Sequence, residues 1–143
     1  DMLARELFVD ASYLIALAVP ADRHHARAIA LMRELETAPR MYVTTQAVPL
    51  EVGDALYRPA HRASACGLLK ALESDPRMQI VPISESLLGR GLTLFRERPD
   101  KEWGLTDCVS FVVMNDLGLT QALTTDVHFE QAGFRALLRE CPA

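Results

Sequence analysis

The sequence predicts an α/β fold: a three-layer sandwich around a mostly parallel sheet of about five strands. Short apolar runs of strand length alternate along the chain with longer segments of helical period, which is typical of parallel sheets covered by helices. The chain has 143 residues, of which 50% are hydrophobic and 24% are charged. This composition is that of a globular domain and excludes disorder, collagen and coiled coil. The length allows one domain, residues 1–143, because domains usually span roughly 100–200 residues.

Five short apolar runs are expected to form the strands. Most are bounded by polar, Gly or Pro residues, as strands of a buried parallel sheet usually are. The expected strands are residues 7–9, 41–44, 78–81, 122–124 and 134–138.

Six stretches between and after these runs are expected to be helices, and several of their ends carry start or stop signals. Asp22, Ser84 and Thr106 are candidate N-caps, because short polar side chains accept hydrogen bonds from the first free N–H groups. Pro20 and Gly118 are candidate stops. The expected helices are residues 12–19, 26–36, 50–57, 60–73, 85–97 and 107–117.

The charge balance limits the ways in which this chain can bind other molecules. It has 15 Lys and Arg against 19 Asp and Glu, which gives a formal charge of −4. A protein that holds nucleic acid by bulk positive charge is therefore excluded, since such domains are basic. Any contact with nucleic acid must be local or made through cations.

The cysteines and the longest apolar run bear on the compartment. Cys66, Cys108 and Cys141 are far apart in the sequence and form no C-x-x-C motif, so neither a disulfide framework nor a thiolate zinc site is expected. The apolar run 13–19 is too short to cross a bilayer, which takes about 20 residues. We expect a cytoplasmic protein without a membrane segment.

Four acids occupy positions where parallel sheets bind ligands. Asp10 ends the first expected strand and Asp126 follows the fourth, at the edge where strand ends and helix starts meet. Glu51 lies among apolar residues after the second strand, and Asp107 begins the helix after a polar loop. Carboxylate oxygens that converge there would suit Mg²⁺ or Mn²⁺ better than zinc.

Electrostatic repulsion makes it costly for these acids to lie close together. Two carboxylates 4 Å apart repel by roughly 4 kcal/mol at an effective dielectric constant of 20. A cluster of four therefore needs a cation or raised pKa values. Each acid alone is also explained as a turn, cap or helix-edge residue, so the functional interpretation depends on their combination.

The segments that carry these acids resemble the four motifs of the PIN-domain family, and they follow one another in the family's order. They span residues 8–17, 44–56, 103–111 and 123–129, the last followed by Gly133 and Phe134. The resemblance extends over residues 7–138. The compact length and the segment 22–26 are similar to the VapC-type toxin branch of the family.

The resemblance implies a metal-dependent endoribonuclease that hydrolyses RNA phosphodiester bonds and leaves a 5′-phosphate. Ser12 and Thr124 match hydroxyl positions that support the site, and Pro49 departs from the usual aliphatic residue before the second acid. An RNA substrate, a cognate antitoxin protein and a homodimer are implied partners, and Mg²⁺ or Mn²⁺ is the implied cofactor. The catalytic and metal-binding residues would be Asp10, Glu51, Asp107 and Asp126.

The polar loop before Asp107 offers candidate RNA contacts. Arg98 and Lys101 would meet the phosphate backbone, and Trp103 would stack on a base. Acidic residues alternate with them, so a solvated loop without RNA contact is an equally good interpretation.

The histidines and Cys108 have simpler structural explanations. Adjacent helical residues point in different directions, so His24 and His25 are interpreted as surface packing rather than as a metal pair. His128 lies beside Asp126 and would touch substrate, but packing against the strand end is the preferred interpretation. Cys108 is expected to be a buried helix residue.

Two other functions compete with the nuclease. A haloacid-dehalogenase-like phosphatase also uses an aspartate after its first strand, but it needs a second acid two residues later, where this chain has Ser12. A catalytically silent PIN-like module that only binds RNA or protein remains open, because the sequence does not show that the four acids meet.

Overall fold

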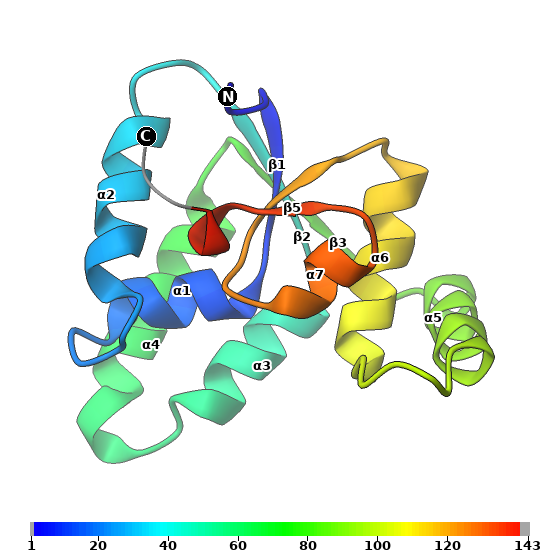
Figure 1. Cartoon of the computed structure of the whole chain (residues 1–143). Helices are drawn as coiled ribbons and strands as arrows, with labels where there is room; N and C mark the ends of the chain where they lie inside the picture. Colours follow the sequence, from blue (N-terminus) through cyan, green and yellow to red (C-terminus); the bar gives the residue numbers. More distant parts are fainter. Residues whose placement is uncertain (1, 141–143) are drawn as a thin grey trace.

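The computed structural model describes residues 2–140, which contain a five-stranded, entirely parallel sheet in the order β3-β2-β1-β4-β5 (Figure 1). The predicted fold class is confirmed. The strands are β1 (Glu6–Val9), β2 (Met41–Thr45), β3 (Met78–Val81), β4 (Gln121–Leu123) and β5 (Arg135–Ala136).

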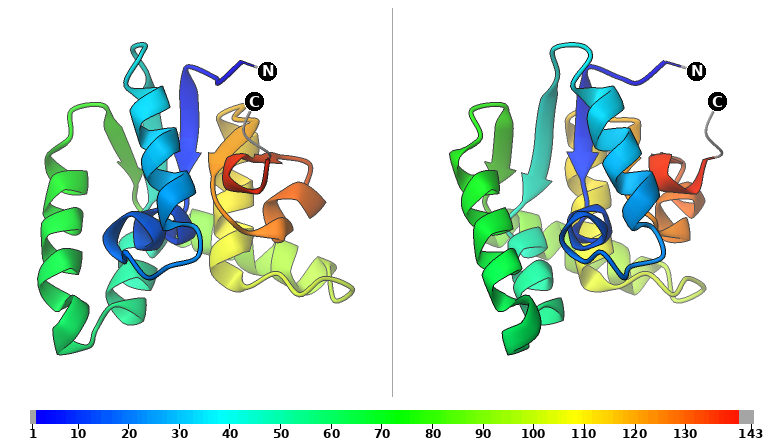
Figure 2. Two further views of the ribbon diagram at one scale, coloured as in Figure 1. Left: turned by 60° about the vertical axis from the view of Figure 1, so that its left-hand side comes forward. Right: turned by 90° about the vertical axis from the view of Figure 1, so that its left-hand side faces the viewer.

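Seven α-helices accompany the sheet in the described part of the chain. Helices α1, α2 and α4 gather on one side of it and α5 and α6 on the other, and Figure 2 shows the sheet between them. The helices are α1 (Ala11–Ala18), α2 (His25–Leu35), α3 (Ala47–Ala55), α4 (Pro59–Ser74), α5 (Glu85–Glu97), α6 (Leu105–Asp116) and α7 (Val127–Gln131).

The central strand β1 is buried on both faces, which explains its unbroken apolar run. Leu7 and Phe8 are fully buried. The Phe8 ring lies 6.1 Å from that of Phe129, and Phe129 packs edge-on against Phe111 with ring centres 5.0 Å apart. These three aromatic rings join β1, α7 and α6, and so fix the elements that carry three of the predicted acids.

The strand register brings sequence-distant residues to one edge of the sheet. Phe8 pairs with Val43 of β2 and with Ala122 of β4, and the next residue, Val9, pairs with Leu123. The backbone N–H of Asp10 donates to the Leu123 carbonyl at 3.1 Å. Asp10 is thus held beside the end of β4.

Two of the predicted caps are wrong and one is confirmed. Ser84 caps α5 by accepting a hydrogen bond from the Leu87 N–H at 3.0 Å. Helix α6 begins at Leu105, so Thr106 lies inside it and Gly104 is the N-cap. Asp22 accepts a hydrogen bond from the His24 N–H at 2.8 Å, but this bond closes a turn before the helix.

The C-terminal segment differs most from the prediction. The expected strand 134–138 is reduced to the two residues of β5, because the chain turns into a 3₁₀ helix at Leu137–Arg139. Helix α7 was not predicted. Gly118 ends α6 as predicted, and its φ of 67° is a conformation that glycine adopts without strain.

The described cysteines are free thiols, with Cys66 exposed and Cys108 buried; Cys141 lies outside the described residues. None of the helices in residues 2–140 combines the length and the apolar character that a membrane span requires.

Candidate active site

Three of the four predicted acids lie at the ends of elements around β1, and the fourth, Glu51, lies in the middle of α3. Asp10 follows β1 at the N-cap position of α1, and Asp126 follows β4 and caps α7 with its side chain. Glu51 comes from α3, and Asp107 comes from the first turn of α6. The parallel topology therefore gathers the acids, because the carboxyl ends of the strands all face the same edge.

Asp10 is the most deeply buried of the four, with 5% of the residue exposed. Its Oδ2 accepts hydrogen bonds from the Thr124 hydroxyl at 2.7 Å and from the Ser12 hydroxyl at 2.8 Å. Burial raises the pKa of Asp10, although these two hydrogen bonds act in the opposite direction.

The same two hydroxyls tie the acid to the segment after β4. Ser12 Oγ accepts from the Thr125 N–H, and Thr124 Oγ1 accepts from the Asp126 N–H, each at 3.0 Å. Ser12 and Thr124 are thus placed to orient Asp10 and to hold the backbone that leads into Asp126.

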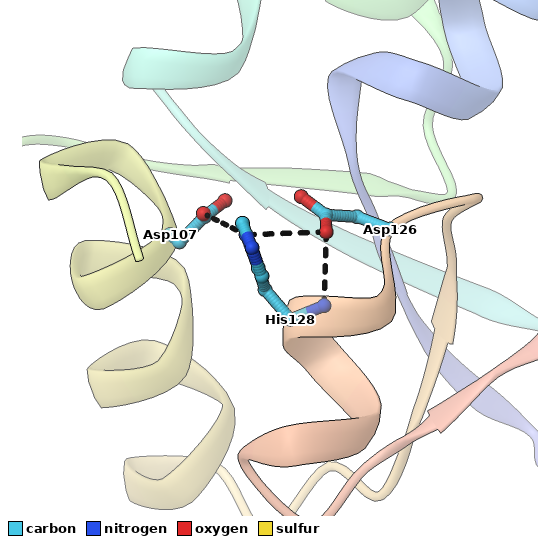
Figure 3. Close-up of side chains that lie close together, drawn as sticks. All are labelled: Asp107, Asp126 and His128. Carbon is cyan, nitrogen blue, oxygen red and sulfur yellow. Dashed lines mark hydrogen bonds and ion pairs between the residues drawn. The ribbon is translucent and has the colours of Figure 1, made fainter. Parts of the chain in front are cut away.

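Asp107, Asp126 and His128 form the tightest group (Figure 3). His128 Nδ1 lies 3.2 Å from Asp107 Oδ2 and 3.2 Å from Asp126 Oδ1. One ligand atom of each residue lies within 4.8 Å of the others. Local backbone bonds fix both carboxylates: Asp107 Oδ2 accepts from the Gly104 N–H, and Asp126 Oδ1 accepts from the His128 N–H.

Glu51 completes the cluster from α3. Partial burial of its carboxyl raises the pKa of Glu51 to about 7, and the charges of Asp10, Asp107 and Asp126 add to the shift. Burial also raises the pKa of Asp107, with smaller contributions from Asp126 and Asp10. The charges of the three aspartates therefore all act on the Glu51 carboxyl.

No lysine or arginine compensates this charge in residues 2–140. The ion pairs that their side chains form use other acids, all at the surface. A cluster of oxygen donors with net negative charge fits a hard divalent cation, since such ions take carboxylate ligands. Asp107, Asp126 and Glu51 have the donor atoms for it, and Asp10 has its second carboxylate oxygen.

Trp103 corrects the prediction for the loop before α6. Only 6% of it is exposed; its ring packs edge-on against Phe111 at 5.1 Å, and its Nε1–H donates to Gln131 Oε1 at 3.0 Å. Little of this ring is open for a base to stack on, because the residue is buried and the Arg98 guanidinium lies 5.1 Å from the ring centre. Trp103 is a core residue.

Arg98 and Lys101 lie around this ring. Arg98 makes a bidentate ion pair with Asp100, and the Lys101 ammonium lies 6.0 Å from the Trp103 ring centre. Both side chains keep a charge at the surface, so contact with a phosphate backbone stays a prediction for these two residues.

For His128, the sequence interpretation preferred packing against the strand end over contact with substrate, and its contacts with Asp107 and Asp126 were not predicted. Its ring belongs to the acidic cluster and not merely to the packing at the strand end. The available signal was the spacing Asp126-x-His128 at a helix start, which is weak because α7 has only five residues. Cys108 is buried as predicted, and His25 makes a structural contact through Nδ1 to the Ala16 carbonyl at 2.7 Å.

Comparison with solved structures finds a protein of similar fold. The chain is similar to the crystal structure of VapC20 from Mycobacterium tuberculosis, described as a toxin that cleaves the sarcin–ricin loop, with a TM-score of 0.80 and 24% sequence identity. The match covers 90% of this chain and 95% of that one. The sequence matches none of the curated proteins with which it was compared.

A family match covers almost the whole sheet and all four acids. The sequence matches the PIN domain over residues 7–135. This range begins in β1, contains every acid of the cluster and ends in β5. The chain therefore belongs to the PIN-domain family.

Proposed function

We propose that this protein is a VapC-like endoribonuclease that hydrolyses RNA with the help of Mg²⁺ or Mn²⁺. One observation carries the proposal: the charges of Asp10, Asp107 and Asp126, from three other segments, act on the Glu51 carboxyl, and no lysine or arginine in residues 2–140 forms an ion pair with these acids. Such repulsion is tolerated when the cluster holds a cation.

Each group of the site has a distinct task in this proposal. Asp107, Asp126 and Glu51 would hold the ion, together with the free oxygen of Asp10. A divalent ion in this position supplies a bound water of lowered pKa and positive charge opposite the phosphate. Ser12 and Thr124 fix the Asp10 carboxylate, and Glu51 is an exposed residue of α3 that RNA could reach.

The proposed partners follow from the same interpretation. A VapC-like toxin requires an antitoxin that blocks it in the cell, and co-expression with the product of the neighbouring gene would test for one. A homodimer is the expected assembly, and sedimentation of the purified protein would measure it.

The decisive test is cleavage of RNA by Asp10→Asn and Asp107→Asn variants. Both should lose more than about 100-fold in rate, because a direct ligand matters at least as much as the residues that support it. Asp54→Asn, on the exposed part of α3, is the matched control and should cut at the wild-type rate. Structured loop RNAs, including a sarcin–ricin loop, should be among the substrates, with product ends checked for a 5′-phosphate.

Two outcomes would overturn the proposal. If the protein binds RNA but does not cut it in the presence of Mg²⁺ or of Mn²⁺, it is a binding module and not a nuclease. Cleavage that persists in EDTA, or in both Asn variants, would separate the activity from the acids.

A further inference from the structure

His128 is a nitrogen donor inside a cluster that otherwise offers only oxygen. Its side chain is 23% exposed, and its Nδ1 lies at equal distances of 3.2 Å from Asp107 Oδ2 and Asp126 Oδ1 (Figure 3). The four acids of the family resemblance do not include it.

The position of this ring is imposed by its neighbours in the fold. The His128 N–H donates to Asp126 Oδ1 at 2.9 Å, which fixes the start of α7. The next residue, Phe129, is fully buried between Phe8 and Phe111. The backbone that carries the imidazole is therefore held on both sides, and the ring is directed at the two carboxylates.

The distances match those of ligands around one ion. Neighbouring ligand atoms of an octahedral ion with bonds of 2.0–2.1 Å are about 3 Å apart. His128 Nδ1 has about this separation from both oxygens, and one ligand atom of each of the three residues lies within 4.8 Å of the others. The imidazole thus stands where a third ligand would stand.

We propose that His128 binds the metal ion directly through Nδ1, beside Asp107 and Asp126, and that this nitrogen makes the site prefer Mn²⁺ to Mg²⁺. The inference rests on the proposed metal-dependent function. Mg²⁺ takes oxygen ligands almost exclusively, whereas affinity for nitrogen donors rises along the transition series that Mn²⁺ begins. Removal of the His128 imidazole should therefore weaken Mn²⁺ binding much more than Mg²⁺ binding.

The test measures binding of each ion alone by calorimetric titration of the wild type and of His128→Ala. We expect His128→Ala to lower the affinity for Mn²⁺ by about tenfold or more, with a change of less than about threefold for Mg²⁺. His61→Ala on α4 is the matched control, because it removes an imidazole from another face of the molecule. Thermal unfolding of the metal-free variants checks that each one folds.

A spectroscopic measurement on the wild type makes the test independent of any variant. Pulsed electron paramagnetic resonance of bound Mn²⁺ should show nitrogen coupling from a directly bound imidazole. The coupling should persist in His61→Ala and vanish in His128→Ala.

The outcomes separate this inference from the proposed function. An equal loss for both ions, or bound Mn²⁺ without nitrogen coupling, would mean that His128 only supports the carboxylates, and would overturn the inference. Unchanged or stronger Mn²⁺ binding in His128→Ala would also overturn it. Asp107→Asn tests the site itself, because unchanged affinity for both ions in that variant would contradict the metal centre as a whole.

Discussion

At the scale of single residues, the acids of the cluster differ in how well their surroundings stabilise the ionised carboxylate. Asp10 is buried, but two hydroxyl groups donate to it and reduce the rise in its pKa. The Glu51 carboxyl is subject to burial and to three like charges, which together raise its pKa to about 7. Without a cation, a pKa of about 7 leaves the Glu51 carboxyl partly protonated near neutral pH.

This difference predicts the pH dependence of stability. The pKa of Glu51 in the folded protein, about 7, is above its ordinary value of 4.5. Protonation of Glu51 therefore contributes stability that is fully present below pH 4.5 and is lost as the pH rises through 7. The melting temperature in EDTA should fall across this window, and Glu51→Gln should reduce the slope.

Asp54→Asn on the same helix is the control and should follow the wild type. Asp10 and Asp107 have shifts of the same sign, so some slope should remain in Glu51→Gln. Parallel curves for the wild type and Glu51→Gln would show that this carboxyl is ionised without cost in the folded protein.

Thr124 offers a test of the hydroxyl pair. Its Oγ1 donates to Asp10 Oδ2 at 2.7 Å and accepts from the Asp126 N–H at 3.0 Å. Thr124→Val keeps the shape but leaves the Asp126 N–H without this acceptor and leaves Asp10 Oδ2 with the Ser12 hydroxyl alone, which should cost about 1–3 kcal/mol of unfolding free energy. Thr124→Ser keeps the hydroxyl and should retain the activity in RNA cleavage. Urea unfolding measures the difference, and equal stability of the two variants would contradict the structural role of the hydroxyl.

At the scale of elements, Trp103 anchors the loop that leads into α6. The buried indole lies one residue before the Gly104 N-cap, whose N–H donates to Asp107 Oδ2 at 3.2 Å. The ring therefore sets where α6 begins and, through it, where the Asp107 carboxylate lies. Its contribution to function is one of position.

The burial of Trp103 leads to a stability prediction. Trp103→Ala should cost about 3–5 kcal/mol, as removal of a large buried side chain usually does. Arg98→Ala should change stability by less than about 0.5 kcal/mol, because its pair with Asp100 is at the surface. Trp103 is the only tryptophan, so its fluorescence should be blue-shifted and little changed by added RNA. Strong quenching of this emission by RNA would restore the stacking interpretation.

Most elements could be predicted because they carry strong local sequence signals, whereas elements with weak signals were missed. The buried strands and the long helices follow from apolar periodicity, and Ser84 and Gly118 follow from cap chemistry. Helix α7 has five residues, of which only Phe129 is buried, so it shows no helical period. Thr106 was chosen as a cap for its hydroxyl, but Gly104 takes the position because the Asp107 side chain accepts its N–H.

At the scale of the whole molecule, the site is a product of topology. Strand β1 lies between β2 and β4, so the segments after these strands meet although they are far apart in the sequence. The rule for parallel sheets predicts this meeting from the order of elements alone. The rule gives no side-chain distances, so the contact of His128 with two carboxylates and the burial of Trp103 could not be predicted.

Convergence of like charges also predicts how the whole fold responds to metal. A divalent ion binds the folded cluster and not the dispersed acids of the unfolded chain, so at 100 times its dissociation constant it should add about 2.7 kcal/mol of stability. For a chain of this length, that corresponds to a rise of roughly 5–10 °C in melting temperature.

Asp107→Asn removes one of the repelling charges, and its amide oxygen still accepts the Gly104 N–H. This variant should therefore melt higher than the wild type in EDTA, and should gain little from Mg²⁺ or Mn²⁺. Asp116→Asn is the opposite control, because it breaks a surface pair with Arg90 and should leave the response to metal intact. If the wild type gains nothing from either ion and Asp107→Asn gains nothing in EDTA, the carboxylates do not repel one another in solution as their placement in the fold requires.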